Sequence, residues 1–75
     1  MTKIVVYDGD LGFNKVGFTK FLRQFGYSLS AAKNITDGLL EGRPVTLEIE
    51  DGELGRIHSE LEALRAKFRL DGEVN

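Results

Sequence analysis

The segment NKVGFTKFLRQF, residues 14–25, predicts a helix with two different faces. At about 100° per residue, its apolar side chains form a single arc made of Phe18, Phe21, Leu22 and Phe25. An arc of this kind packs a helix against a hydrophobic core. A separate arc, roughly opposite, is mostly basic and holds Lys15, Val16, Thr19, Lys20 and Arg23. A positive patch around a small apolar spot is typical of protein docking, so we expect this outward arc to bind another protein.

The residues before this helix predict a central strand. From Lys3 to Asp8 the sequence holds an almost unbroken apolar run, most of which favours extended structure. Such a run is more typical of a strand inside a sheet than of one at its edge. Gly9 to Gly12 then break the strand, and Asn14 can cap the helix by accepting a hydrogen bond from the backbone of its first turn.

The residues after the helix predict a second helix in close contact with it. We expect the first helix to run to about Phe25, and Gly26 suits the position beyond its end, where a left-handed backbone costs glycine least. Ser28 can cap the second helix. Its expected inward stripe is Leu29, Ala32, Ile35, Thr36 and Leu39. Two helices joined by so few residues must pack as a hairpin or cross at a steep angle.

A second strand follows Pro44. Proline lacks a backbone donor and biases the preceding residue toward extended geometry, so it ends the second helix. Apolar and polar residues then alternate, with Val45, Leu47 and Ile49 on one side and Thr46, Glu48 and Glu50 on the other. This period of two is expected when one face of a sheet is buried and the other is solvated.

The end of the chain predicts a third helix and a last strand. After a turn at Asp51-Gly52, apolar residues recur at helical spacing at Leu54, Ile57, Leu61, Leu64 and Phe68. In the final strand, Leu70, Gly72 and Val74 alternate with Arg69, Asp71 and Glu73. The predicted order is βααβαβ in one domain, residues 1–75. We therefore expect an α+β (α/β) two-layer sandwich with three helices on one face of a three-stranded sheet.

Composition excludes several classes of protein. The chain has no cysteine, which excludes a disulfide scaffold and a thiolate zinc site. A net charge of −2 makes nucleic-acid binding unlikely. The charge is unevenly divided, because residues 1–43 hold six basic and four acidic side chains while residues 44–75 hold four and eight. Without an apolar stretch long enough for a signal peptide or a membrane span, we expect a cytoplasmic protein that starts at Met1 and has no membrane contact.

No residue pattern predicts an enzyme. Gly9 and Gly12 lie between a strand and a helix, but their spacing fits neither GxGxxG nor GxxxxGK[ST]. Asp8 and Asp10 lack the further oxygen ligands that calcium requires. His58 is the only histidine. Without a second histidine or a cysteine it is a poor metal ligand, and without a paired nucleophile it is a poor general base. We therefore expect no catalytic residue, no metal and no cofactor.

Two further surfaces keep other hypotheses open. The helix pair around Gly26-Tyr27-Ser28 has the outline of a helix-turn-helix, although its second helix offers bases little beyond Lys33 and Asn34, so DNA binding is the weaker alternative. The acidic run Glu48, Glu50, Asp51 and Glu53 is typical of a solvated surface, and a second docking site is the alternative.

The pattern NKVGFTKFLR, followed by Gly26, Leu29 and Ala32-Lys33, resembles the C-terminal domain of the bacterial ribosomal stalk protein. That family has a basic first helix of the form NKVxxxKxxR, a turn with Gly-Leu and an EAK-type second helix. The resemblance extends over about residues 3–74 and implies contact with translational GTPases. The positions that match this contact are Lys15, Val16, Lys20, Arg23, Leu29 and Lys33, and Thr19 stands where the family usually has an exposed isoleucine or valine. This chain lacks the stalk protein's dimerising region and hinge, so we expect a stand-alone domain.

A second, weaker resemblance is to the Clp protease adaptor that recognises N-terminal degrons. Its landmarks correspond here to Lys3–Asp10, Leu22-Arg23, Phe25-Gly26 and Gly42-Arg43. That family holds a peptide amine with an Asn-Asp pair, whereas this chain has Asp8-Gly9-Asp10.

The sequence as a whole predicts a non-enzymatic protein-interaction module. We expect its partner to be a translational GTPase or a ribosome-linked factor, with a degron or peptide adaptor as the alternative. The oligomeric state is not indicated. The residues expected to contact the partner, called the docking surface below, are Lys15, Val16, Thr19, Lys20, Arg23, Leu29 and Lys33.

Overall fold

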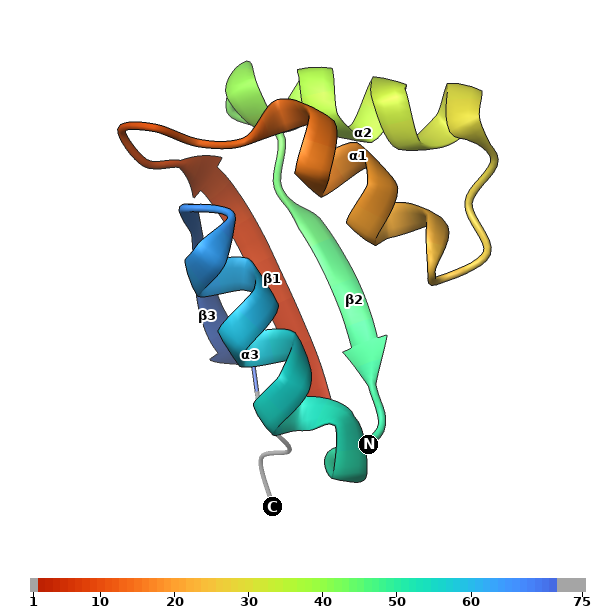
Figure 1. Cartoon of the computed structure of the whole chain (residues 1–75), viewed down its shortest axis with the longest axis vertical. Helices are drawn as coiled ribbons and strands as arrows, with labels where there is room; N and C mark the ends of the chain where they lie inside the picture. Colours follow the sequence, from red (N-terminus) through yellow and green to blue (C-terminus); the bar gives the residue numbers. More distant parts are fainter. Residues whose placement is uncertain (1, 72–75) are drawn as a thin grey trace.

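The sheet is built around the first strand (Figure 1). In the computed structural model, which describes residues 2–71, β1 (Thr2–Gly9) lies between β2 (Val45–Ile49) and β3 (Ala66–Asp71). Both neighbours pair with β1 in antiparallel fashion. This confirms the central position predicted from the apolar run of β1.

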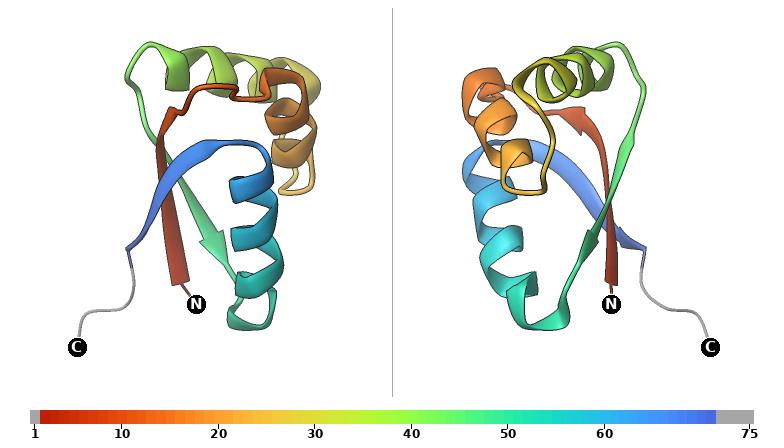
Figure 2. Two further views of the ribbon diagram at one scale, coloured as in Figure 1. Left: turned by 60° about the vertical axis from the view of Figure 1, so that its left-hand side comes forward. Right: turned by 90° about the vertical axis from the view of Figure 1, so that its right-hand side faces the viewer.

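The helices form the second layer. They are α1 (Lys15–Arg23), α2 (Leu29–Leu40) and α3 (Leu54–Ala63), and a short 3₁₀ turn, η1 (Asp51–Glu53), leads into α3. Figure 2 shows the three helices on one side of the sheet. The predicted βααβαβ order and the α+β fold class are therefore confirmed.

The hydrophobic core lies between the two layers. Every second residue of the strands points toward the helices, and the three helices each contribute buried side chains. The core consists of Ile4, Val6, Phe18, Phe21, Leu22, Ala32, Leu39, Leu47, Ile49, Ile57, Leu61 and Ala66. Burying each large apolar side chain contributes about 1.5–3 kcal/mol, so this set provides the main stabilisation of a short chain.

No helix formed by residues 2–71 covers the opposite face of the sheet. Val5 points to this face, since its neighbours Ile4 and Val6 point into the core. Val5 is nevertheless only 6% exposed. Its register partners are Thr46 on β2 and Arg69 on β3, whose side chains flank it on either side. The valine is therefore covered by its own sheet.

The predicted starts of the first two helices are confirmed by their side-chain caps, whereas α1 ends at Arg23 and not at about Phe25. The Asn14 side chain accepts a hydrogen bond from the backbone N–H of Gly17 at 2.8 Å, at the start of α1. The Ser28 side chain accepts one from the N–H of Ala31 at 3.1 Å, at the start of α2. Gly26, between the helices, has a φ of 90°, which glycine adopts at low cost.

The prediction was wrong about where the third helix ends and the last strand begins. α3 ends at Ala63, and Arg65 has a φ of 63°, so the backbone reverses there and no helix can continue. β3 begins at Ala66 and includes Phe68, which the helical spacing had placed in α3. The predicted strand residues Gly72, Glu73 and Val74 lie outside the described residues.

Leu29 was also placed wrongly in the inward stripe of α2. The buried residues of that stripe are Ala32, Thr36 and Leu39, whereas Leu29 is 47% exposed. The first turn of α2 extends beyond the edge strand β2 in Figure 1, so the sheet does not cover the start of this helix. This leucine belongs to the surface of the helix pair.

Candidate protein-docking surface

The outward side of α1 carries exposed residues of the docking surface. Phe18 and Leu22 are fully buried and fix the rotation of the helix against the core. The same rotation leaves Val16, Lys20 and Arg23 exposed. Val16 is 67% exposed, which is high for an apolar side chain on a short helix. The outward side of α1 therefore presents one apolar side chain, Val16, and two cations, Lys20 and Arg23.

Two polar contacts join α1 and α2 along their length. The ammonium of Lys15 lies 3.6 Å from the carboxylate of Asp37, and both side chains are more than half exposed. An exposed pair of this kind contributes little to stability. The second contact is buried deeper, between the hydroxyl groups of Thr19 and Thr36, whose oxygens are 3.0 Å apart.

The hydroxyl groups of Thr19 and Thr36 have two hydrogens between them for three possible hydrogen bonds. Each hydroxyl is also within hydrogen-bond distance of the carbonyl four residues earlier in its own helix, Lys15 for Thr19 at 3.0 Å and Ala32 for Thr36 at 2.9 Å. Because a hydroxyl has one hydrogen, only two of the three contacts can be hydrogen bonds at a time. Thr36 is only 1% exposed, so the two threonines form a buried polar contact between α1 and α2.

Thr19 therefore does not belong to the outward arc in which the sequence placed it. Its side chain is half-buried between the helices, while its neighbour Lys20 is exposed. The wheel of a single helix cannot indicate this, because it omits the second helix that packs beside α1.

A hollow of about 210 Å³ lies along the contact between α1 and α2. Four residues of the docking surface line it together with two others: Lys15, Val16, Thr19, Lys33, Thr36 and Asp37. Thr36 is the buried member of this set, and Lys15, Val16, Lys33 and Asp37 are its exposed members. The hollow thus combines an apolar wall, two cations and one carboxylate.

The other three residues of the docking surface lie outside this hollow. Lys20 lines a separate groove of about 310 Å³ between α1 and α3, which includes Phe21, Gln24 and Glu60. Arg23 and Leu29 are exposed on either side of the turn that joins the two helices. The structure therefore brings four of the seven predicted residues together. The remaining three lie on the outward side of α1 and beside the turn that follows it.

Asp37 is the lining residue that the sequence reasoning missed. Asp37 follows a stretch, Leu11 to Thr36, that has four basic residues and no acidic one, so it lies just beyond the basic part of the sequence. Asp37 lies four residues after Lys33, the spacing that puts two side chains on one helix face. Within residues 2–71, Lys20, Arg23 and Lys33 have no ion-pair partner, while Asp37 pairs with Lys15.

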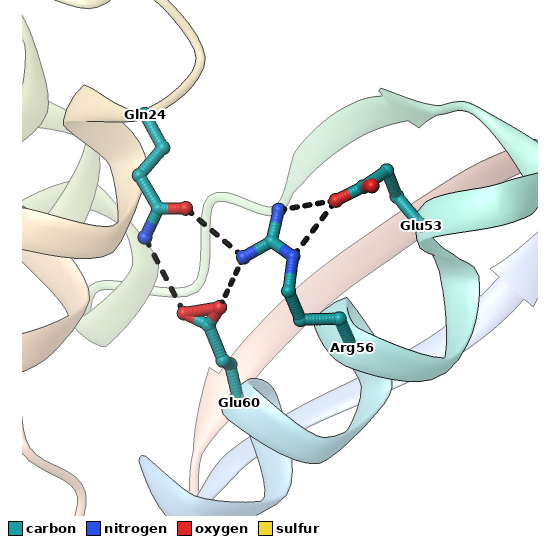
Figure 3. Close-up of polar contacts among 4 residues, drawn as sticks. All are labelled: Gln24, Glu53, Arg56 and Glu60. Carbon is teal, nitrogen blue, oxygen red and sulfur yellow. Dashed lines mark hydrogen bonds and ion pairs between the residues drawn. The ribbon is translucent and has the colours of Figure 1, made fainter.

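A polar network joins the end of α1 to α3 at the surface (Figure 3). Arg56 on α3 donates to Glu53 at 2.7 Å and to Glu60 at 2.6 Å. It also donates to Gln24 at 3.2 Å, and the Gln24 amide donates to Glu60 at 3.3 Å. The hydrogen bond to Glu53 and the charge of both carboxylates raise the pKa of the Arg56 guanidinium above its ordinary value. Since Gln24 follows α1 directly, the network links the C-terminal end of this helix to α3.

The residues considered for chemistry make ordinary structural contacts. The His58 ring packs edge-on against Phe68, with ring centres 5.1 Å apart. The carboxylates of Asp8 and Asp10 each accept a hydrogen bond from the next backbone N–H at 2.8 Å. Residues 2–71 contain no cluster of three or more acidic, histidine or cysteine residues that could hold a metal ion. No helix in the same range combines the length and the apolar character needed to cross a bilayer.

Comparison with known proteins adds no family to these observations. The chain matches no protein-family model, no curated protein and no solved structure.

Proposed function

We propose that this protein is a non-enzymatic interaction module that binds another protein through the docking surface on α1 and α2. The observation that carries the proposal is the hollow between the two helices, where the exposed Val16 lies among basic side chains. An exposed apolar side chain among cations favours a partner that covers the apolar side chain and places carboxylates opposite the cations.

The charges of the docking surface specify the chemistry of the partner. Lys20, Arg23 and Lys33 have no ion-pair partner among residues 2–71, so they are free to meet carboxylates of another protein. Val16 and the exposed Leu29 supply apolar contacts near these cations. We infer a partner whose surface is acidic around one or two apolar side chains.

The resemblance to the stalk-protein domain supports a partner linked to translation. In that family the matching positions contact translational GTPases, and six of them correspond to basic or apolar residues that are exposed here: Lys15, Val16, Lys20, Arg23, Leu29 and Lys33. We therefore propose a translational GTPase or another ribosome-linked factor as the partner class, and a cytoplasmic location for the protein.

Affinity capture tests the proposal. Immobilised wild-type protein should retain a translation factor from a cell lysate, and Lys20→Glu should lose it. Arg65→Glu is the matched control, because it makes the same charge change at an exposed position between α3 and β3, outside the docking surface. Melting curves of both variants establish that they fold. Equal retention by the wild type and both variants would contradict docking through this surface.

A further inference from the structure

β3 is an edge strand with an open side. The sheet order β2-β1-β3 leaves one side of β3 unpaired, and among the described residues no helix or loop runs along that side in Figures 1 and 2. An open edge presents backbone N–H and C=O groups to any strand that can align with it. The side chains of β3 therefore decide which strand can pair there.

The charges on β3 change sign along the strand. Lys67, Arg69 and Asp71 point to the face without helices, and they alternate with Ala66, Phe68 and Leu70 on the helix side. Along the strand, two basic residues on this face therefore precede Leu70 and one acidic residue follows it. A strand with this order is complementary in charge to a second copy of itself running antiparallel.

We propose that two copies of this chain pair edge to edge through β3, with Leu70 of one copy directly opposite Leu70 of the other. In this register, Arg69 of each copy lies opposite Asp71 of the other, so the pair occurs twice. The contact is isologous, as in most protein dimers. It continues the sheet across both copies and places all the helices on the same face.

The exposure of Leu70 supports this register. Its side chain is 51% exposed although it is on the helix side of the sheet, next to its register partner Ile4, which is fully buried. Two Leu70 side chains facing each other would cover both. Within residues 2–71 neither Arg69 nor Asp71 has an ion-pair partner, so both are available to a second copy.

Other symmetric registers oppose like charges. Pairing centred on Arg69 would put two arginines opposite each other, and pairing centred on Phe68 would put Arg69 opposite Lys67. Like charges directly opposite each other destabilise a strand pair. The charge order of β3 therefore selects Leu70 as the centre.

This contact leaves the docking surface free, because that surface lies on α1 and α2. A dimer formed through β3 would carry two docking surfaces. It could therefore bind a partner that has two matching sites more tightly than a single copy does. The dimer does not depend on the proposed function, and each can fail without the other.

Sedimentation over a concentration series tests the dimer and its register. Arg69→Asp alone, or Asp71→Arg alone, replaces both opposite-charge pairs with like charges and should raise the dissociation constant of the dimer by about tenfold or more. The double variant restores both pairs in reversed order and should return to within about threefold of the wild type. Lys33→Glu on the docking surface is the control and should leave dimerisation unchanged. A wild type that is monomeric at about 1 mM, or a dimer unaffected by the single reversals or not restored by the double variant, would overturn the proposal.

Cross-linking tests the geometry independently. The chain has no cysteine, so Leu70→Cys supplies a single thiol per copy. Residues directly opposite in antiparallel strands have Cβ atoms about 4.5–5.5 Å apart, close to the range that a disulfide spans. Mild oxidation should cross-link Leu70→Cys into dimers and leave Leu40→Cys, a similarly exposed leucine on α2, uncross-linked. Equal cross-linking of the two variants, or none at Leu70→Cys, would contradict the register.

Discussion

The hydroxyl oxygens of Thr19 on α1 and Thr36 on α2 lie 3.0 Å apart beneath the hollow that joins the two helices. Two short side chains at this point let the helices approach without filling the space above them. The contact therefore determines both how the helices pack and that a hollow remains between Val16 and Lys33. The rest of the docking surface depends on this spacing.

Replacing Thr36 should therefore weaken the fold more than replacing Thr19. Thr36→Val keeps the shape of the side chain but removes a buried hydroxyl bonded to Ala32, at a cost of about 1 kcal/mol. Thr19→Val leaves that bond in place and alters a half-buried side chain, so we expect a loss below about 0.5 kcal/mol. Urea unfolding of the two variants makes the comparison. Equal losses, or a larger one for Thr19→Val, would contradict the description of this contact.

Gly17→Ala should destabilise the protein, although alanine is the better helix former by about 1 kcal/mol. A Cβ atom on Gly17 would lie 2.6 Å from the Leu64 side chain and 2.7 Å from the capping Asn14 side chain. Relieving this overlap displaces the Asn14 side chain from its cap on Gly17, and the loss of such a cap costs about 0.5–2 kcal/mol. The shift that Leu64 must also make adds to this loss.

Gly55→Ala is the matched control for that variant. Gly55 lies within α3, and a Cβ atom there would meet nothing within 4 Å. Only the helix propensity changes, so we expect a gain of about 0.5–1 kcal/mol. Thermal melts of the two variants should shift in opposite directions. A shift of the same sign would show that α1 does not approach Leu64 as closely as the structure has it.

Leu61→Ala tests the core beneath α3. Leu61 is fully buried, so truncating it removes packing and leaves a cavity, at a cost of about 2–5 kcal/mol. In a domain of this size that loss is a large part of the total stability. Leu11→Ala removes the same atoms from a side chain that is 90% exposed and should change the unfolding free energy by less than about 0.5 kcal/mol. Similar losses for both variants would mean that α3 is not packed through Leu61.

The sequence was sufficient to predict the fold because its local signals agree with one another. Asn14 and Ser28 mark the helix starts and cap them in the structure. The alternation from Val45 to Ile49 predicted one buried and one solvated face of β2, and Leu47 and Ile49 are buried while Glu48 is exposed. Local periodicity and capping thus decide both element type and orientation.

The errors occurred where tertiary contacts override local spacing. Phe68 continues the helical period of α3, but the backbone reverses at Arg65 and the ring instead packs on His58 from β3. Thr19 appeared outward because the wheel of α1 omits the packing of α2. The contribution of Asp37 to the hollow was missed for the same reason, since it depends on two helices lying side by side.

The helix-turn-helix alternative predicts sequence-selective binding to duplex DNA, which we do not expect of this protein. A DNA reader should bind duplexes with sequence preference and with affinity that falls steeply as salt rises. The exposed residues of α2 that would face bases are few, among them Lys33 and Asn34. Fluorescence anisotropy with a pool of duplexes at physiological salt should give no preferred site. Sub-micromolar binding to one sequence would place DNA ahead of protein as the partner.

An amide-shift titration tests the docking surface most directly. Isotope-labelled protein would be titrated with a purified translational GTPase, and in parallel with the factor recovered by affinity capture. We expect shifts along α1 and the start of α2, including Val16, Lys20 and Lys33, and their loss in Lys20→Glu. Arg65→Glu should retain them. Shifts confined to β2 around Glu48, with α1 and α2 unchanged, would contradict the assignment of the docking surface.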